Sequence, residues 1–140
     1  MEEEALSAYE YALAVNPDNY FALFNKGNLL STAGLYNDAI EAYLEYLEYE
    51  DENVEALTYA GECYHKTGDK LKALKFYQQA IDLDPDFPDP WFGIGMVWLS
   101  DKAGDSIMYF RKAVSLDPEN NEYWYYLSKA QFIIDQKKES

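Results

Sequence analysis

Two residues of this 140-residue chain, Cys63 and His65, could bind a transition metal or serve as a nucleophile and its base. They are the one cysteine and the one histidine of the sequence. Residues two apart on a helix lie on different faces, so these two cannot hold one metal ion between them. We therefore interpret Cys63 as a small packing residue and His65 as a solvated surface residue. A single cysteine also excludes a disulfide bond within the chain.

A run of aspartates, Asp82, Asp84, Asp86 and Asp89, has the alternating spacing of calcium ligands. The run lacks the glycine and the distal glutamate of a calcium-binding loop. It is better explained as a turn between two helices, with Asp89 as N-cap and Pro90 as the first helical residue. The sequence contains no glycine-rich phosphate loop and no nucleophile-elbow motif. These observations indicate that the protein is not an enzyme and needs no metal or other cofactor.

The net charge of −15 restricts the possible partners. Nucleic acids and anionic membrane surfaces attract clustered Lys and Arg, so neither is expected as a partner. An acidic chain suits a basic partner, or the charge serves solubility. No apolar run is long enough to span a membrane, and the acidic N-terminus lacks a signal-peptide core. These absences favour the cytoplasm, although the compartment stays open if the chain is a fragment.

The elements that position these residues are indicated by an internal repeat. Five sets of residues recur with a step of 34, and in the four sets that continue into the last repeat the final step is 33. The sets are Gly27, Gly61 and Gly95; Leu23, Leu57, Trp91 and Trp124; Ala5, Ala39, Ala73 and Ser106; Tyr9, Tyr43, Tyr77 and Phe110; and Pro17, Asp51, Pro85 and Pro118. A period shared by five independent sets is typical of tandem structural repeats.

Each repeat has the pattern of two amphipathic helices. In the best example the apolar residues recur at helical spacing in two stretches, Leu57, Ala60, Gly61 and Tyr64, then Ala73, Tyr77, Ala80 and Ile81. Gly68 separates the two stretches, and Asp69 is placed to cap the second helix. Pro85 ends the repeat because proline is not tolerated inside a helix. One hairpin cannot bury both its faces, so copies must stack.

These residues resemble the tetratricopeptide repeat, whose pattern is matched by Trp91, Ile94, Gly95 and Trp98 in a first helix and by Ala73, Tyr77, Ala80 and Pro85 in a second. The resemblance implies an all-α fold, a right-handed α-solenoid of antiparallel helix-turn-helix repeats with about eight helices. We expect a single domain over residues 1–140. It would consist of a half repeat (1–17), three full repeats (20–51, 54–85 and 88–118) and a terminal helix (121–136), followed by a frayed tail.

Several positions depart from the family pattern. Lys26 stands where leucine is usual, Tyr46 where alanine is usual, and Asp51 where proline is usual. One residue is missing between Trp98 and Ser106, so the turn from Asp101 to Gly104 should differ from the others. Neither end of the chain carries the polar outer face of a solenoid cap. We infer a fragment of a longer array, or ends that something else covers.

In this family the first helices line a concave face that binds partners, and the packing sets above identify the opposite side of each first helix. The predicted groove residues are Phe21, Phe24, Asn25, Asn28, Glu55, Tyr59, Glu62, Phe92, Met96, Tyr125 and Tyr126. Thr58 and Gly93 are placed on the same side. Aromatic residues exposed in this way mark interfaces, although some could instead pack between neighbouring helices. The groove predicts a protein or peptide partner that carries apolar and basic residues.

One subclass of the family grips an acidic C-terminal tail with Lys, Asn and Arg. Asn28 matches one such asparagine, but Tyr59, Asp89 and Gly93 occupy other positions of that clamp, so an acidic tail is not expected. An alternative function is a structural, self-associating element, for example a homodimer through the terminal helices. The terminal helix is apolar on more than one face, with Tyr123, Trp124, Tyr125, Tyr126, Leu127, Phe132, Ile133 and Ile134. Sequence alone identifies neither the partner nor the oligomeric state.

Overall fold

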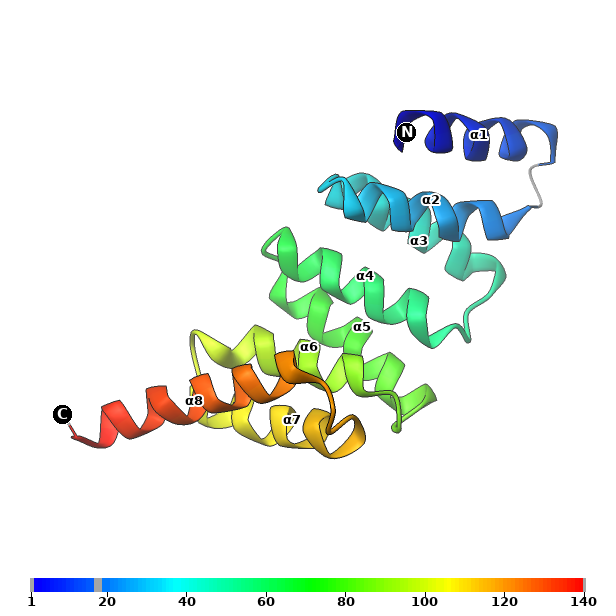
Figure 1. Ribbon diagram of the computed structural model, residues 1–140. Coiled ribbons are helices and arrows are strands. Elements are labelled where there is room, and N and C mark those ends of the chain that lie inside the picture. Colours follow the sequence, from blue (N-terminus) through cyan, green and yellow to red (C-terminus); the bar gives the residue numbers. More distant parts are fainter. Residues whose placement is uncertain (1, 17–18, 140) are drawn as a thin grey trace. The chain divides into compact units, whose positions relative to one another are not determined.

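A computed structural model describes residues 2–16 and 19–139 of the chain (Figure 1). Over these residues it contains eight α-helices and no β-strand, which confirms the all-α fold class. The helices are α1 (Glu2–Val15), α2 (Tyr20–Thr32), α3 (Tyr36–Tyr49), α4 (Val54–Lys66), α5 (Lys70–Leu83), α6 (Pro88–Leu99), α7 (Ala103–Leu116) and α8 (Asn121–Glu139). Pro17, one member of the predicted proline set, lies outside the described residues.

The chain divides into two compact units, and α5 runs from one into the other. The first unit covers residues 1–76 and holds α1 to α4 with the beginning of α5. The second unit covers residues 77–140 and holds the rest of α5 with α6, α7 and α8. Each unit is described by itself below.

Each unit contains a hairpin in which a glycine of the first helix faces an aromatic ring of the second helix. A Cβ atom added to Gly27 on α2 would lie 2.6 Å from Cε1 of Tyr43 on α3. A Cβ atom on Gly95 of α6 would lie 2.5 Å from Cε1 of Phe110 on α7. Both rings are fully buried. The repeated glycine is therefore required by the close approach of the two helices.

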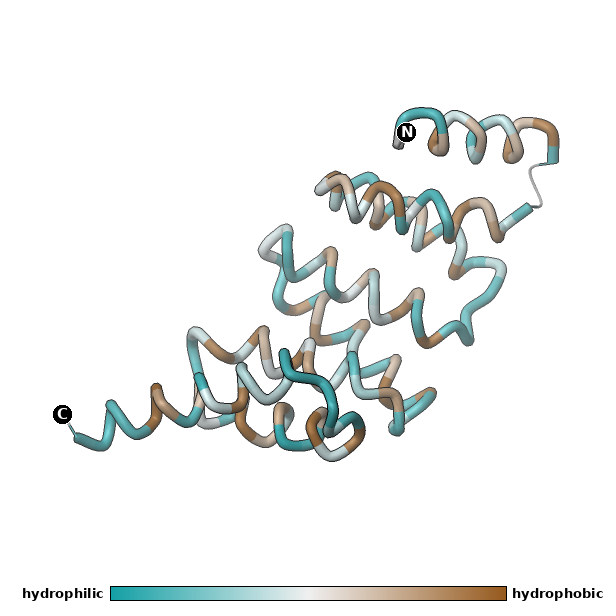
Figure 2. Tube along the Cα trace, viewed as in Figure 1, coloured by the Kyte–Doolittle hydropathy of each residue, from teal (hydrophilic) through white to brown (hydrophobic). Residues whose placement is uncertain are grey.

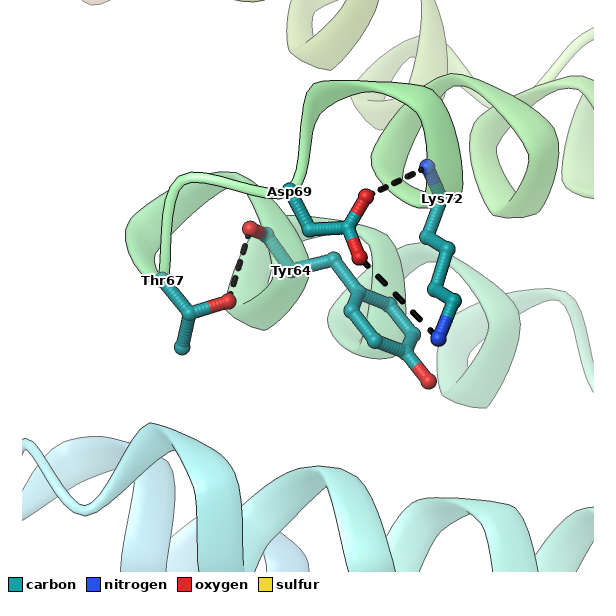
Figure 3. A network of polar contacts seen from close by, with 4 residues as sticks. All are labelled: Tyr64, Thr67, Asp69 and Lys72. Atoms are coloured by element: carbon teal, nitrogen blue, oxygen red, sulfur yellow. Dashed lines mark hydrogen bonds and ion pairs between the residues drawn. The ribbon is translucent and has the colours of Figure 1, made fainter.

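The turns after α2 and α4 are built alike. Gly34 and Gly68 adopt φ angles of +82° and +89°, in the left-handed region that glycine reaches without strain. The backbone N–H of Asp69 then donates to the carbonyl of Tyr64 at 2.9 Å. The Asp69 carboxylate accepts a hydrogen bond from the backbone N–H of Lys72, which confirms its predicted role as cap of α5 (Figure 3).

The turn after α6 differs, as the missing residue predicts. The backbone N–H groups of Asp101 and Lys102 both donate to the carbonyl of Trp98, at 3.2 and 2.7 Å. Gly104 lies inside α7, and no positive φ occurs there. Our placement of Gly104 in the turn is therefore wrong, because the tighter turn is already complete at Lys102.

Two further helix ends differ from the prediction. Helix α6 begins at Pro88 with Phe87 as N-cap, so Asp89 lies in the first turn and is not the cap. Proline is favoured at the first helical position because its missing N–H would have no partner there, and Pro88 takes this role before Pro90 can. The tail also remains helical to Glu139 instead of fraying from Lys137 onward.

Hydrophobic and hydrophilic residues are interleaved along the helices (Figure 2). Within the described ranges no helix is both long enough and apolar enough to cross a membrane. This interleaving is typical of helices that bury one side and expose the other.

Candidate functional site

The predicted groove residues of the first unit form what we term the first-unit face. It consists of Phe21, Phe24, Asn25 and Asn28 on α2 with Glu55, Tyr59 and Glu62 on α4. Asn25, Glu55 and Glu62 are exposed, and Phe21 is 63% exposed. The first-unit face is therefore polar and acidic around one accessible aromatic side chain.

Two aromatic side chains of the first-unit face are half-buried because they pack on α3. The Phe24 ring lies 5.2 Å from the ring of Tyr46 and 6.1 Å from that of Tyr43. The Tyr59 ring stacks on Phe24 at 6.2 Å and lies equally far from Tyr43. Phe24 and Tyr59 thus join α2 to α4. They pack between neighbouring helices, which was the alternative to their being exposed interface residues.

A buried tyrosine also orders the polar part of the first-unit face. The hydroxyl group of Tyr43 donates to Oδ1 of Asn28 at 2.6 Å. Burial raises the pKa of Tyr43 above its usual value, and the neighbouring Cys63, Tyr59 and Glu62 raise it further. Tyr43 is therefore a neutral donor that fixes the Asn28 amide.

Cys63 is fully buried, as its interpretation as a packing residue requires. Its Sγ atom donates to Oγ of Ser31 at 3.6 Å, and burial raises the pKa of the thiol. A protonated thiol is a poor nucleophile and a poor metal ligand. The geometry thus leaves Cys63 without the reactivity that its residue type could offer.

Two residues placed by the sequence on the open side of α4 are less accessible than predicted. His65 is half-buried instead of solvated, and its pKa is lowered by burial and by the charges of Lys66 and Lys70. Thr58 is buried, and its hydroxyl group donates to the carbonyl of Val54 at 2.7 Å. The open side of a helix predicted from one packing set is wider than the side that stays open once neighbouring helices stack.

Two of the three departures from the repeat pattern, Lys26 and Tyr46, have a local partner in the first unit. The Lys26 ammonium group lies 3.7 Å from the Glu10 carboxylate on α1. The hydroxyl group of Tyr46 accepts a hydrogen bond from Nδ2 of Asn53 at 2.9 Å. The side-chain Oδ1 of Asn53 in turn accepts a hydrogen bond from the backbone N–H of Ala56, so Asn53 caps α4. In both cases a larger and more polar side chain is accommodated by an ion pair or a hydrogen bond within the first unit.

The pair formed by Lys26 and Glu10 borders a cavity of about 290 Å³ between α1, α2 and α3. The cavity is lined by Glu10, Leu23, Lys26, Leu30, Asp38, Glu41, Ala42 and Glu45. We interpret it as the consequence of a charged side chain at a position that usually packs, since Lys26 reaches toward carboxylates rather than filling the space.

The predicted groove residues of the second unit form the second-unit face, which consists of Phe92 and Met96 on α6 with Tyr125 and Tyr126 on α8. Tyr125 is 60% exposed, and the other three residues are half-buried. The Lys129 ammonium group lies 5.7 Å from the centroid of the Tyr126 ring. The second-unit face is therefore mainly apolar, with a cation at its edge.

Phe92 is the centre of a ring cluster in the second unit. Its ring lies 4.7 Å from that of Tyr123, 5.5 Å from that of Tyr126 and 5.6 Å from that of Phe110. Aromatic rings at such distances contribute stability beyond the area that they bury. Phe92 therefore joins α6, α7 and α8 and offers less surface to a partner than the sequence suggests.

Asp89 and Gly93 also have packing roles. Asp89 accepts a hydrogen bond from the hydroxyl group of Tyr123, whose pKa is raised by burial and by this bond. A Cβ atom on Gly93 would lie 2.4 Å from Cζ of Tyr77. The prediction that Gly93 lies on the open side of α6 is wrong, because the Tyr77 ring covers it.

The sequence-based site omitted Phe132, which is as exposed as Tyr125. The two residues are seven apart on α8 and so lie on one side of the helix. Helical spacing from Tyr125 could have identified Phe132. It was treated instead as part of the terminal apolar surface.

The described side chains form surfaces that suit recognition. In residues 2–16 and 19–139 no three His, Cys, Asp or Glu side chains gather in a way that could hold a metal ion. Two faces of contrasting character, each carrying an exposed aromatic residue, suit contact with another molecule.

Comparison with known proteins identifies the repeat. The family model described as tetratricopeptide repeat matches residues 3–48 and 24–88. The general transcriptional corepressor trfA of Dictyostelium discoideum is 34% identical over 99 residues, which is 69% of this chain and 7% of the relative. The chain therefore spans less than a tenth of the length of that curated relative.

Solved structures support the fold over most of the chain. A crystal structure of MamA protein has a TM-score of 0.82 and 25% identity, covering 92% of this chain and 71% of the other. The first tetratricopeptide repeat domain of Spaghetti (RPAP3), bound to the HSP90 peptide SRMEEVD, has a TM-score of 0.77 and 20% identity. That similarity covers 83% of this chain and 93% of the other. The expected class of helical-repeat solenoid is confirmed by these likenesses.

Proposed function

The chain belongs to the tetratricopeptide repeat family, and we propose that it is a protein-interaction scaffold that binds a peptide or protein segment through its first helices. The observation that carries this proposal is the exposure of Phe21 and Tyr125 on helices α2 and α8. Exposed aromatic side chains among polar neighbours are typical of interface anchors. The related domain of Spaghetti (RPAP3) binds a peptide, which supports the same kind of role here.

The two faces suggest the chemistry of the partner. Exposed Glu55 and Glu62 on the first-unit face favour Lys or Arg in the bound segment. Tyr125 and half-buried Met96 on the second-unit face favour aliphatic or aromatic side chains. Apolar contact would provide most of the affinity, because an exposed ion pair contributes only about 0–1 kcal/mol. The carboxylates would mainly speed association and reject acidic competitors.

The acidic HSP90 peptide bound by Spaghetti (RPAP3) is not proposed as a model for this partner. Asn28 could match an asparagine of such a clamp, but its Oδ1 atom already accepts from Tyr43. Tyr59 and the carboxylate of Glu62 lie near the Tyr43 side chain that holds this amide. We propose a basic segment for the first-unit face, and we propose no catalytic activity and no cofactor.

A selection of random 12-residue peptides displayed on phage tests this proposal. We expect enrichment of peptides that combine Lys or Arg with aromatic or aliphatic residues. A synthetic peptide that binds the first-unit face should bind the variant Phe21→Ala several-fold more weakly, and one that binds the second-unit face should bind Tyr125→Ala several-fold more weakly, since truncating an anchor costs about 1–2 kcal/mol. Raising the salt concentration should slow association more than it speeds dissociation.

Lys75→Ala and Gln79→Ala are matched controls, because both side chains are exposed on α5, outside the proposed faces. They should bind the selected peptide as the parent does. The proposal fails if the double variant Phe21→Ala/Tyr125→Ala stays folded by circular dichroism and binds as tightly as the parent. A second candidate function, self-association, is favoured by the exposure of Trp124 and Tyr11 at the two terminal helices.

A further inference from the structure

Three aromatic rings are stacked where α2 begins and α3 ends, two helix ends that lie on the same side of the hairpin (Figure 1). The Tyr20 ring is in the middle, 4.9 Å from the ring of Phe21 and 5.8 Å from that of Tyr49. Their planes are inclined to that of Tyr20 by only 29° and 9°. Phe21 and Tyr49 are both more than half exposed, so each outer ring keeps one face accessible. We term these three residues the aromatic stack.

The aromatic stack is held in place by the core of the first unit. The middle ring, Tyr20, is half-buried and lies 6.0 Å from the ring of buried Tyr46. Tyr20 packs against the core cluster that Tyr46 forms with Leu23 and Ala56. A ring that is already fixed loses little freedom when a partner binds, so the outer faces form a preorganised surface.

The repeat does not require aromatic residues at the positions of the two outer rings. In the later first helices the position of Phe21 is occupied by Glu55, Asp89 and Glu122. In the later second helices the position of Tyr49 is occupied by Leu83 and Leu116. The other hairpins thus form without rings at these positions, which favours a binding role for the aromatic stack.

The chain around Tyr49 is acidic and contains no cation. Residues 27–64 include nine Asp and Glu and no Lys, Arg or His. Four of the carboxylates flank Tyr49 and are exposed, namely Glu48, Glu50, Asp51 and Glu52. Glu48 and Glu50 lie at the C-terminus of α3, where the helix dipole disfavours negative charge, and the last turn of α3 has no basic residue. A cation bound beside Tyr49 would relieve this repulsion.

Other aromatic rings of the chain are covered by its own lysines. The ammonium groups of four lysines lie 5.3–5.7 Å from ring centroids, in the pairs Lys72 with Tyr64, Lys102 with Trp98, Lys112 with Trp91 and Lys129 with Tyr126. Within the part of the chain that the structure describes, no Lys or Arg lies over a ring of the aromatic stack in this way. The aromatic stack therefore offers a surface for a cation that another molecule provides.

We propose that the aromatic stack binds an arginine side chain of the partner, with the guanidinium group flat against the open face of Tyr49. The planar guanidinium group stacks on an aromatic face while its N–H groups donate in the plane to carboxylates. The exposed carboxylates of Glu50 and Asp51, next to Tyr49 in the chain, are available to accept them. This inference rests on the proposed function, because Phe21 belongs to the first-unit face, and it names the basic residue that the bound segment carries.

The shape of the aromatic stack favours arginine over the other cations of proteins. A methylated lysine has a rounded cationic head that is best held by rings enclosing it as a cage. The rings of Phe21, Tyr20 and Tyr49 are nearly parallel, so they present flat outer faces and no enclosure. An unmodified lysine ends in a compact, strongly hydrated ammonium group, which gains less than guanidinium from a flat ring.

Three matched peptides test the proposal by fluorescence anisotropy at one ionic strength. Each is a labelled eight-residue peptide in which glycine alternates with arginine, with lysine or with trimethyl-lysine. The parent should bind the arginine peptide about three- to fivefold more tightly than either of the others. The variant Tyr49→Leu, which introduces the residue type of Leu83 and Leu116, should bind the arginine and lysine peptides equally. Tyr36→Leu is the matched control and should keep the preference, because Tyr36 lies about 20 Å away at the other end of α3.

A nuclear magnetic resonance titration of the parent gives a reading that does not depend on the folding of a variant. The ring-proton signals of Tyr49 should shift with the arginine peptide more than with the lysine peptide. Signals of Tyr49 that shift with neither peptide would overturn the proposal. Equal affinity of the parent for the arginine and lysine peptides would overturn it too, as would tighter binding of the trimethyl-lysine peptide or an unchanged preference in folded Tyr49→Leu.

The result separates this inference from the proposed function. If peptides selected on phage depend on Phe21 or Tyr125 while the parent binds the arginine and lysine peptides equally, only the assignment of arginine to the aromatic stack fails. If the selection yields no peptide that depends on Phe21 or Tyr125, the proposed function fails. A preference for arginine that Tyr49→Leu removes would then still support the aromatic stack as an arginine site.

Discussion

The first-unit face and the second-unit face place different chemistry at the same repeat positions. One such position holds Asn28 on α2 and Glu62 on α4, both polar. The same position holds Met96 on α6, which is apolar, and Lys129 on α8, which is a cation. The first unit has 15 Asp and Glu against 5 Lys, and the second has 11 against 6 Lys and Arg.

This contrast teaches that the repeat fixes the hairpin interior while leaving the faces free to vary. Gly27 with Tyr43 and Gly95 with Phe110 form nearly the same close contact in the two units. The residues outside that contact differ in charge, size and burial. Sensitivity to salt should therefore reside in the first unit and apolar affinity in the second.

The largest expected effect separates packing aromatics from exposed ones. Phe92→Ala should lower the free energy of unfolding by about 3 kcal/mol, since its ring contacts three others and truncation leaves a cavity. Phe21→Ala should change it by less than about 0.5 kcal/mol, because that side chain is exposed. Urea denaturation followed by circular dichroism measures both. If Phe92→Ala leaves the free energy of unfolding unchanged, Phe92 is instead a candidate binding anchor.

A smaller effect sharpens the claim that both units share one hairpin interior. Gly27→Ala and Gly95→Ala should each destabilise the chain by about 1–3 kcal/mol, because the new Cβ atom overlaps an aromatic ring. Gly104→Ala should stabilise it by about 0.4–1 kcal/mol, since the site is helical, exposed and free of neighbours within 4 Å. Thermal melts of the three variants show whether each substitution lowers or raises the melting temperature. Equal behaviour of Gly95→Ala and Gly104→Ala would contradict the close contact with Phe110.

The smallest effect concerns pH and belongs to the first unit, which carries the one histidine of the sequence. Burial and nearby lysines hold the pKa of His65 below its usual 6.5 in the folded chain. The unfolded chain then binds the proton first, so stability falls as the pH drops below about 6.5. His65→Gln should lessen this fall relative to the parent. Urea midpoints of both proteins from about pH 7.5 to about pH 5.5 measure the difference.

The hairpins were predictable because the glycine and aromatic sets are spaced by the geometry of the repeat itself. The altered turn before α7 was predicted by the same counting of residues. Its end at Lys102 was not, because the geometry of a loop depends on backbone hydrogen bonds that residue spacing does not specify. The cap role of Asp69 was correct, whereas that of Asp89 was wrong because Pro88 already begins the helix.

The candidate faces were harder to predict in detail. The direction of Tyr59 and Phe92 on their helices follows from the repeat, but their burial depends on how large the residues of the next helix are. Phe92 meets Tyr123, which is a much larger residue than Ala22 or Ala56 at the same repeat position. Phe21 and Tyr125, rather than Tyr59 and Phe92, therefore provide the accessible aromatic surface.

The uneven placement of tryptophan gives each unit its own optical signal. Trp91, Trp98 and Trp124 all belong to the second unit, whereas the aromatic residues of the first unit are tyrosine and phenylalanine. Emission excited selectively from indole therefore reports the second unit, while far-ultraviolet ellipticity reports the helices of both. During unfolding, coincidence of the two signals means that α5 transmits cooperativity across the boundary at residue 76, and separation of the signals means that each unit melts by itself.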